Sequence, residues 1–238
     1  MSLFVIADTH LSLSSDKPMD VFGGRWNDYH RKLEERWRAV VSDDDTVIVP
    51  GDISWAMTLE EGLCDLKFLD SLPGKKIISK GNHEYWWSTA TKINKFFLEH
   101  DIKSISLLHN NSYIVENVAV CGTRGWYSEN ANPGNMTEMK KIVAREAGRL
   151  KMSIESTGDF DGEKIVFFHF PPVFDGYVCR ELIDLLHFYG IKRCFFGHIH
   201  GKYDLSKVFD FENIEMRLIS ADFLDFIPYK IDKSPKKI

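Results

Sequence analysis

The sequence predicts an α/β protein in which two β-sheets are flanked by helices, and three observations support this prediction. In the first half of the chain, short apolar runs alternate with amphipathic helical patterns, which is typical of parallel strands joined by crossover helices. In the middle and near the end, β-rich runs predominate, so a second sheet is expected there. The 238 residues contain no repeat, low-complexity tract or linker, and this length suffices for one large core. We therefore expect a single domain over residues 1–238.

The first sheet is expected to contain three strands, each followed by a helix. The strands are predicted over Leu3–Ala7, Thr46–Val49 and Lys76–Ser79. The helices are predicted over Asn27–Val41, near Thr58–Leu72 and over Ser88–His100. Thr58 and Glu61 have the spacing of a capping box, in which two side chains bond to backbone N–H groups at a helix start. The second helix is therefore expected to begin near Thr58.

The middle and the last part of the chain are expected to build the second sheet. Ser112–Glu116 and Val118–Gly122 are β-rich runs on either side of Asn117, which predicts a hairpin. Tyr127–Gly134 is polar and contains Asn and Pro, which predicts a loop. After this loop we expect a long helix, a strand, a second helix and three strands, at Thr137–Ile154, Lys164–Phe168, Tyr177–Tyr189, Arg193–Phe196, Lys207–Phe211 and Ile214–Ser220.

The composition argues against several classes of partner. The chain has 30 Lys and Arg against 35 Asp and Glu, a formal net charge of −5, so we expect no general binding to nucleic acid or to an anionic membrane. No apolar run reaches the roughly 18–20 residues of a membrane span, and the longest is interrupted by His169. The 4 cysteines are scattered without a CxxC pair, and the N-terminal residues resemble a strand rather than a secretory signal. These features predict a cytoplasmic protein.

Polar clusters follow the predicted strands at one recurring place, the residue or two after the C-terminal end of a strand. The clusters are Asp8-Thr9-His10, Gly51-Asp52, Gly81-Asn82-His83-Glu84, His169 and Gly197-His198-Ile199-His200. Because the C-terminal ends of parallel strands meet at one rim, where ligand crevices open, we expect these segments to converge. Each cluster alone has an ordinary explanation, such as a helix cap, a turn or a core histidine. Together, in this order, they predict one functional site.

The predicted site combines imidazole nitrogens with carboxylate and amide oxygens. Five of the 9 histidines lie in it, with two aspartates and Asn82, and no cysteine does. Such a donor set suits Mn²⁺, Fe, Zn²⁺ or Ni²⁺ rather than a structural zinc held by thiolates. The donors exceed what one ion with open positions needs. We therefore expect two divalent or trivalent ions, about 3.5–4 Å apart and bridged by a carboxylate.

These residues carry a family resemblance. The set Asp8-x-His10, Gly51-Asp52, Gly81-Asn82-His83-Glu84, His169 and Gly197-His198-x-His200 resembles the motif set of the calcineurin-like metallophosphoesterase superfamily. The resemblance spans residues 8 to 200, and it is specific because all of its parts occur in order. It implies a four-layer α/β/β/α sandwich of two mixed sheets flanked by helices, with a dinuclear metal centre at one rim. Within the superfamily, the chain resembles the small single-domain bacterial phosphohydrolases.

The resemblance also implies roles for individual residues. One metal ion would be held by Asp8, His10 and His200, the other by Asn82, His169 and His198, with Asp52 bridging them. His83 would not bind metal; it would act as a general acid near the leaving oxygen and help to hold the phosphoryl group. Two cations lower the pKa of a shared water, and the resulting bridging hydroxide would attack phosphorus in line. The expected function is hydrolysis of a phosphomonoester or phosphodiester, with a small phosphate ester as substrate.

The chain departs from the Ser/Thr protein phosphatases, whose second motif continues as Gly-Asp-x-x-Asp-Arg-Gly. Trp55 stands where those enzymes have the carboxylate that orients the catalytic histidine, and Ala56 stands where they have a phosphate-binding arginine. Protein phosphatase activity is therefore not the expected one. The carboxylates that could orient the catalytic histidine instead are Glu60, Glu61 and Glu84, and each could equally be a helix cap or a solvated side chain.

Arg124 is the candidate substrate-binding residue that would replace the missing arginine. It follows a predicted strand and has glycines nearby on both sides, which leave room for a ligand. An ordinary surface arginine is the alternative, and Arg25 is a weaker candidate for the same role. Aromatic residues near these loops could form a stacking wall for a base or aryl group, or could simply close the rim over the core.

Three alternative functions compete with hydrolysis of a small phosphate ester. A nucleotide phosphodiesterase or nuclease is the closest, although a nuclease usually needs a basic groove that the acidic composition does not favour. A non-catalytic metal-binding docking module should have lost a ligand or the catalytic histidine, and every such position is filled here. A metal hydrolase of other substrates would carry a His-x-His-x-Asp-His set, which the sequence lacks.

Overall fold

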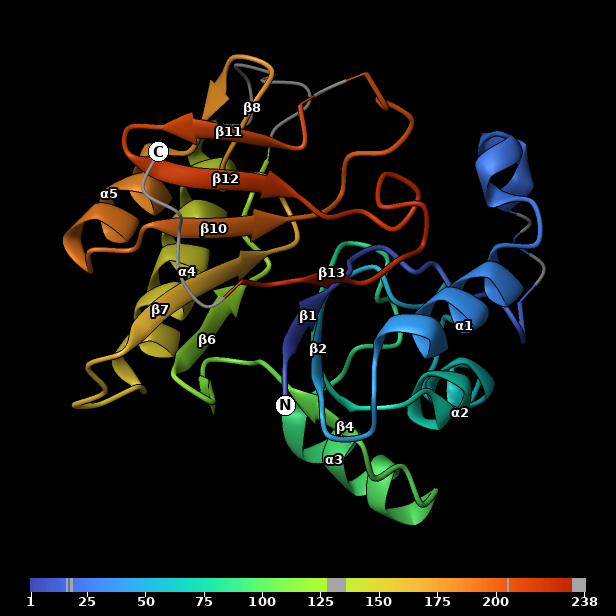
Figure 1. Cartoon of the computed structure of the whole chain (residues 1–238). Coiled ribbons are helices and arrows are strands. Elements are labelled where there is room, and N and C mark those ends of the chain that lie inside the picture. Colours follow the sequence, from blue (N-terminus) through green and yellow to red (C-terminus); the bar gives the residue numbers. More distant parts are fainter. Residues whose placement is uncertain (16, 18, 128–135, 205, 233–238) are drawn as a thin grey trace.

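The computed structural model describes residues 1–15, 17, 19–127, 136–204 and 206–232, and it contains two large β-sheets flanked by helices (Figure 1). Both large sheets contain parallel and antiparallel pairs. Apolar side chains from both sheets form one cluster between them, and separate clusters join each sheet to its helices. The α/β class and the four-layer α/β/β/α arrangement of mixed sheets are therefore confirmed.

The first sheet has 5 strands in the order β13-β1-β2-β3-β4. They are β1 (Leu3–Val5), β2 (Thr46–Pro50), β3 (Lys75–Ser79), β4 (Ile105–Leu107) and β13 (Tyr229–Lys230). β1 to β4 are parallel, whereas β13 pairs antiparallel with β1 at the edge. The three strands predicted for this sheet are confirmed. The sequence analysis missed β4 and β13, because runs of 3 and 2 residues are too short to show a side-chain pattern.

The second sheet has 6 strands in the order β11-β12-β10-β7-β6-β5. They are β5 (Tyr113–Val115), β6 (Val118–Thr123), β7 (Glu163–Phe168), β10 (Arg193–Phe196), β11 (Val208–Phe211) and β12 (Ile214–Leu218). The four central strands are parallel and the two edge strands are antiparallel to their neighbours. The hairpin predicted around Asn117 is the β5–β6 pair, so this prediction is confirmed.

The described residues form five α-helices, which are α1 (Tyr29–Val40), α2 (Leu63–Ser71), α3 (Ala90–Glu99), α4 (Met136–Glu155) and α5 (Arg180–Phe188). The predicted start of α2 was wrong. Thr58 Oγ1 does accept the Glu61 N–H at 3.1 Å, but the Glu61 carboxylate accepts the Met57 N–H at 2.9 Å instead of completing a capping box. Residues 58–62 therefore form turns, and the helix begins at Leu63.

The predicted start of α5 was also too early. Tyr177–Val178 is a short strand, β9, that pairs with β8 (Val173–Phe174), so the helix begins only at Arg180. The loop predicted over Tyr127–Gly134 lies, apart from Tyr127, outside the described residues.

Alternation along the strands divides the apolar residues between the layers. In β7, Val166 and Phe168 face the cluster that includes α4 and α5, whereas Ile165 and Phe167 face the first sheet. Helices α1, α2 and α3 cover the outer face of the first sheet. Their apolar side chains recur with the 3.6-residue period of a helix, so they lie on the side of each helix that faces the sheet. This packing fixes both sheets, and with them the rim at their C-terminal strand ends.

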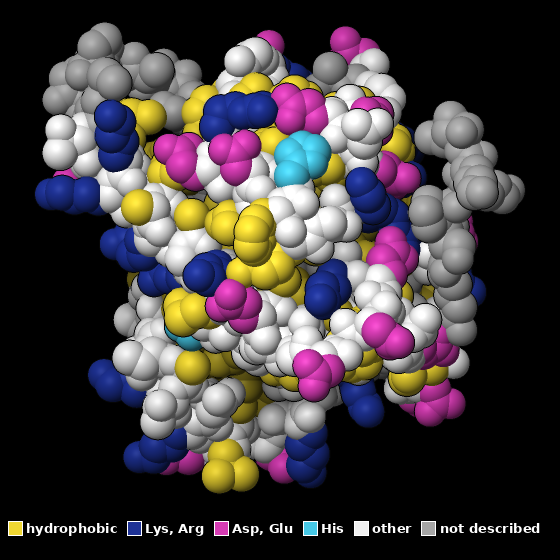
Figure 2. All heavy atoms as spheres, turned by 90° about the vertical axis from the view of Figure 1, so that its left-hand side faces the viewer, with side chains coloured by type: hydrophobic (Ala, Val, Ile, Leu, Met, Phe, Trp, Pro, Cys, Tyr) yellow, Lys and Arg dark blue, Asp and Glu magenta, His cyan; other side chains and the backbone are white. Residues whose placement is uncertain are grey.

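The surface around α5 and β11, on the left of Figure 1, carries interspersed cationic and anionic side chains with small hydrophobic patches between them (Figure 2). Such mixing produces no extended field of one sign on this face. Within the part of the chain that the structure describes, no helix combines the length and the apolar character needed to cross a bilayer.

Candidate metal centre

The loops that follow β1, β2, β3, β7 and β10 meet at one rim of the molecule. Backbone hydrogen bonds hold them together: the Asp8 N–H donates to the Gly51 carbonyl at 3.0 Å, and the Gly197 N–H donates to the His169 carbonyl at 3.1 Å. The polar clusters that follow the predicted strands are thus brought side by side by the backbone.

Asp8, His10 and His200 form a first cluster, in which one donor atom from each side chain lies within 4.8 Å of the others. The Nε2 atoms of His10 and His200 are 3.2 Å apart, and His200 Nε2 is 3.8 Å from Asp8 Oδ1. Donors that bind one ion at about 2.0–2.2 Å lie about 3–3.5 Å from each other. The spacing of this cluster therefore fits a shared metal ion.

Asp52, His169 and His198 form a second cluster by the same criterion. His169 Nε2 lies 3.5 Å from Asp52 Oδ1 and 2.6 Å from Asn82 Oδ1, so the Asn82 amide belongs to this cluster as well. The other carboxylate oxygen, Asp52 Oδ2, lies 3.8 Å from His10 Nε2 of the first cluster. Asp52 thus stands between the clusters with one oxygen toward each.

The electrostatics of the clusters fit a bound cation. Burial raises the pKa of Asp8 to about 8, against the opposing influence of His200, and burial also raises the pKa of Asp52. Burial and neighbouring imidazoles hold the pKa values of His10 and His169 well below the usual one, so both rings are neutral and can offer lone pairs. A cation beside the carboxyls would stabilise their ionised form. This donor set of carboxylates, neutral imidazoles and an amide is one that Mn²⁺, Fe, Zn²⁺ or Ni²⁺ accepts.

The backbone at the clusters is held in an uncommon conformation. Asp8, His10, Asp52 and His198 have φ values of 60°, 44°, 51° and 71°, in the left-handed region that residues with a Cβ seldom occupy. Such conformations persist only where the surrounding packing determines them, and they concentrate at functional sites. Their presence at four of the predicted ligands indicates that the fold positions these side chains at the expense of local backbone preference.

Glycines let the ligand-bearing segments approach each other. A Cβ at Gly51, whose φ is +92°, would lie 2.7 Å from His169 Nδ1. A Cβ at Gly197 would collide with the Asp8 carboxylate and would lie 2.7 Å from the Ala7 Cβ. The close packing of the segments therefore requires glycine at both positions, directly before Asp52 and directly before His198.

Glu84 fixes two of the loops to each other. Its buried carboxylate accepts the Asp52 N–H at 2.9 Å and also accepts the N–H groups of Ile53 and Gly81. Burial raises its pKa to about 8, with a contribution from Asp52, although the three N–H donors oppose this shift. Glu84 is thus a positioning residue for the loops that carry Asp52 and Asn82, and its carboxylate is not available to orient His83.

The sequence analysis missed a carboxylate that contacts a predicted ligand. Asp222 Oδ1 lies 2.9 Å from His200 Nδ1, and Asp222 Oδ2 accepts the Gly201 N–H and the Tyr203 hydroxyl, both at 3.1 Å. Burial opposes protonation of His200, but the hydrogen bond to Asp222 and the charge of Asp8 raise its pKa to about 9. Asp222 holds the ring so that Nε2 faces the cluster, an arrangement common around metal-binding histidines. Its position two residues after the predicted strand Ile214–Ser220 was the available signal.

Replacing Asp222 by Asn is expected to weaken metal binding by about 10–100-fold, the usual effect of removing a partner of a ligating histidine. The amide keeps the size of the side chain but loses the charge that sets the orientation and basicity of His200. Metal affinity can be measured by competition with a chelator, with Asp184→Asn on the exposed face of α5 as the matched control. An unchanged affinity would show that His200 needs no such support.

His83 lies beside the clusters and is partly open to solvent, with 29% of its side chain exposed. Its Nε2 is 3.9 Å from Asp52 Oδ2, its Nδ1 is 3.2 Å from the Tyr85 hydroxyl, and its ring packs against Trp55 with centroids 4.2 Å apart. Burial lowers the pKa of His83, whereas Asp52 favours its protonated form. In the described structure Glu60 and Glu61, two of the carboxylates considered for orienting it, have no hydrogen bond or ion pair with it. The ring instead contacts Asp52, Tyr85 and Trp55.

A hollow of about 150 Å³ opens over the clusters. Its walls combine the imidazoles with the aromatic side chains of Trp26, Trp55 and Phe22. Trp55 stacks on His10 with ring centroids 5.0 Å apart and an interplanar angle of 23°, so it closes the rim and also contacts the site. Trp55 thus closes the rim, whereas a stacking wall for a base or aryl group stays a prediction.

The structure separates the two arginine candidates from this hollow. Arg124 lines a neighbouring cavity, with its Nη2 3.8 Å from the buried carboxylate of Glu146. Arg25 donates to the Asp222 carbonyl at 3.0 Å and lies over the Tyr203 ring at 3.8 Å, so it supports the segment that carries Asp222. All predicted metal-binding residues and His83 are brought together at the rim, whereas Arg124 stands beside them.

Comparison with known proteins agrees with this site. The family model for calcineurin-like phosphoesterases matches residues 1–202. Among solved structures, a phosphopantetheinyl hydrolase from Mycobacterium tuberculosis is similar with a TM-score of 0.59 and 14% identity, over 100% of this chain and 98% of that one. A protein from Thermus thermophilus, TT1561, is similar with a TM-score of 0.53 and 10% identity, over 93% of this chain and 89% of that one. These two likenesses bear on the fold alone.

No protein of curated function matches the sequence. The matched family model nevertheless covers most of the chain and includes every residue of both donor clusters as well as His83. The chain therefore belongs to the calcineurin-like phosphoesterase family, and it is a metal-dependent hydrolase that acts on phosphoric ester bonds.

Proposed function

We propose that this chain is a dinuclear phosphohydrolase that cleaves a small phosphomonoester or phosphodiester in the cytoplasm. The observation that carries the proposal is the pair of donor clusters with Asp52 between them, one carboxylate oxygen toward each. A single-ion site would need only one of the clusters. The sharing of one carboxylate is the feature expected of two ions that act on the same phosphoryl group.

The residues divide between the two ions according to their cluster. Asp8, His10 and His200 would hold one ion, Asn82, His169 and His198 would hold the other, and Asp52 would contact both. When bound, such ions supply Lewis-acid polarisation of phosphoryl oxygens and acidify a water molecule at neutral pH. Mn²⁺, Fe, Zn²⁺ and Ni²⁺ all fit these donors, and availability in the cell would select among them.

His83 is proposed as the general acid. Its Nε2 faces the centre beside Asp52, while the Tyr85 hydroxyl and the Trp55 ring limit the rotation of the imidazole. A proton donated to the leaving oxygen prevents build-up of alkoxide charge as the phosphorus–oxygen bond breaks. The hollow above the clusters admits the leaving group, and its aromatic walls exclude part of the bulk water.

The test is turnover of bis-p-nitrophenyl phosphate beside p-nitrophenyl phosphate, with protein stripped of metal and then reloaded with Mn²⁺. We expect turnover by the reloaded protein, none by the stripped protein, and about two ions per chain by elemental analysis. The ratio of diester to monoester turnover then assigns the substrate type. Absence of both bound metal and turnover after reloading would contradict the proposal and favour the docking-module alternative.

A further inference from the structure

A second cavity, of about 570 Å³, opens beside the metal centre. We call it the basic pocket; the lining residues that matter for its chemistry are Lys80, Trp87, Thr89, Arg124, Arg145 and Arg149. It lies where the C-terminal ends of β3 and β6 approach α4 and the start of α3. Its volume is within the range of about 300–1,000 Å³ that is usual for small-molecule sites.

The basic pocket adjoins the second donor cluster. Lys80 stands two residues before Asn82 in the loop after β3. The Arg124 carbonyl accepts the N–H of Phe170, the residue after His169, at 2.9 Å. Among the described residues, the pocket shares no lining residue with the hollow that contains His83, so the two openings are separate.

The charge of the basic pocket is concentrated and one-sided. In the part of the chain that the structure describes, four cationic side chains line it and no carboxylate does. Glu146 lies buried behind the wall, where it accepts from Arg149 Nη1 and from Thr123 Oγ1, both at 2.6 Å. One carboxylate cannot neutralise four cations, and a chain with a net charge of −5 has no general excess of cations. The pocket is therefore a local site of positive potential.

Unused hydrogen-bond donors point to an oxyanion ligand. Within the described residues, Arg124 Nε and Trp87 Nε1 are buried atoms without a hydrogen-bond partner. Burial lowers the pKa of Arg124, and the nearby Arg149 and Arg145 lower it further, although Glu146 opposes this. α3 begins at the same pocket with Thr89 as its N-cap, which adds the positive end of a helix dipole. A phosphate group in the pocket would accept from the ammonium and guanidinium groups that line it and would neutralise their charge.

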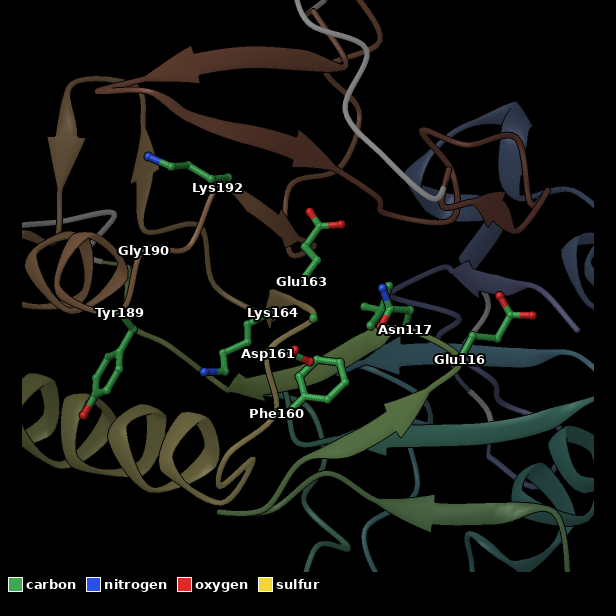
Figure 3. A pocket seen from close by; sticks show the side chains of 11 residues that line it. Glu116, Asn117, Phe160, Asp161, Glu163, Lys164, Tyr189, Gly190 and Lys192 are labelled. Atoms are coloured by element: carbon green, nitrogen blue, oxygen red, sulfur yellow. The ribbon is translucent and has the colours of Figure 1, made fainter.

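A cavity on another part of the molecule has a different character. It measures about 660 Å³ and lies at the N-terminal ends of β6, β7 and β10, away from every predicted ligand. Its lining mixes Glu116, Asp161 and Glu163 with Lys164 and Lys192. Figure 3 shows the charged ends of Lys164 and Glu116 pointing in opposite directions. This cavity therefore lacks the one-sided charge of the basic pocket.

We propose that the basic pocket binds a second phosphoryl group of the substrate, one that is not hydrolysed. The substrate class is then phosphoesters that carry two phosphoryl groups, with the scissile one at the metal centre and the other beside Arg124 and Arg145. This proposal rests on the proposed function. A free inorganic phosphate would use the same donors, so the test must separate a group on the substrate from an independent anion.

The test compares 1,6-hexanediol bisphosphate with hexyl phosphate, which differ by one phosphoryl group. Calorimetric Kd values are measured on Mn²⁺-loaded His83→Ala protein, and kcat/KM is measured on the protein with His83 intact. Arg145→Gln removes an exposed cation of the pocket, and Lys151→Gln, further along α4, removes a matched cation outside it. We expect the protein to prefer the bisphosphate, both in Kd and in kcat/KM. Arg145→Gln should lower this preference about tenfold, because a charge-assisted hydrogen bond is lost, whereas Lys151→Gln should leave it unchanged.

Equal affinity for the two esters, or an equal loss for both in Arg145→Gln, would overturn the proposal. Saturable binding of inorganic phosphate that Arg145→Gln abolishes, without a preference for the bisphosphate, would overturn it too by assigning the pocket to an independent anion. Because the calorimetric comparison needs no turnover, a protein that prefers the bisphosphate but hydrolyses nothing would support the pocket while contradicting the proposed function.

Discussion

Replacing Asp52 by Asn is expected to reduce bound metal from about two ions per chain to one or none. It should also lower turnover by more than about 100-fold, because removing even a hydrogen-bond partner of a metal ligand can lower activity by about 100-fold. The two Asp52 oxygens face different clusters, at 3.5 Å from His169 Nε2 and 3.8 Å from His10 Nε2. An amide offers one oxygen and an NH₂ group that cannot bind a cation. One of the two ions must therefore lose a ligand.

Elemental analysis and turnover of p-nitrophenyl phosphate with Mn²⁺ measure this effect. Asp101→Asn is the matched control, because Asp101 is exposed and contacts only Lys103 among the described ion pairs. A variant at Asp52 that kept two ions and near-normal turnover would show that the carboxylate does not bridge.

Replacing His83 by Ala is expected to leave both ions bound and to lower kcat by about 10²–10⁴-fold for an alkyl phosphate, the usual contribution of a positioned general acid. None of the donor atoms in either three-residue cluster belongs to His83. The loss should be smaller for p-nitrophenyl phosphate, because p-nitrophenolate leaves without much protonation. The comparison of the two substrates therefore separates proton donation from general damage to the site.

His187→Ala is the control for the loss of an imidazole, since His187 lies on α5 and pairs with Glu212 at 3.2 Å. If His83→Ala lost metal in proportion to its activity, His83 would be a ligand rather than an acid. If kcat fell equally for the alkyl phosphate and for p-nitrophenyl phosphate, the role of His83 would be to hold the phosphoryl group rather than to donate a proton.

The position of the site could be predicted in part from strand direction. Parallel strands place their C-terminal residues at one rim of a sheet, so Asp8 and Asp52 meet in the first sheet, and His169 and His198 meet in the second. The packing of the two sheets against each other brings these two rims together, and no local sequence pattern reveals that packing. The elements themselves followed from periodicity wherever they were long enough. Short elements such as β4 and β13 depend on neighbours far away in the sequence, which no local pattern reveals.

The supporting residues could not be predicted for a related reason. Glu84, Tyr85 and Asp222 act through loop conformation, which is decided by contacts between segments rather than by residue type. Glu84 was considered as a partner of His83, yet its carboxylate accepts backbone N–H groups instead. Arg124 was expected near the scissile phosphate, but in the structure it lines a separate cavity. The cationic side chains of that cavity and its unpartnered donors are what suggest a ligand for it.

The pairing of β13 with β1 links the two ends of the described chain, so the first sheet is complete only after β13 has been synthesised. His10 and His200 are 190 residues apart, so at about 5–20 residues per second the ribosome needs roughly 10–40 s between them. During that interval, Val5, Ile48 and Ile77 on the inner face of the first sheet lack the second sheet that covers them. This face is where aggregation of the nascent chain is expected to begin, and the metal centre can form only after His200 has been synthesised.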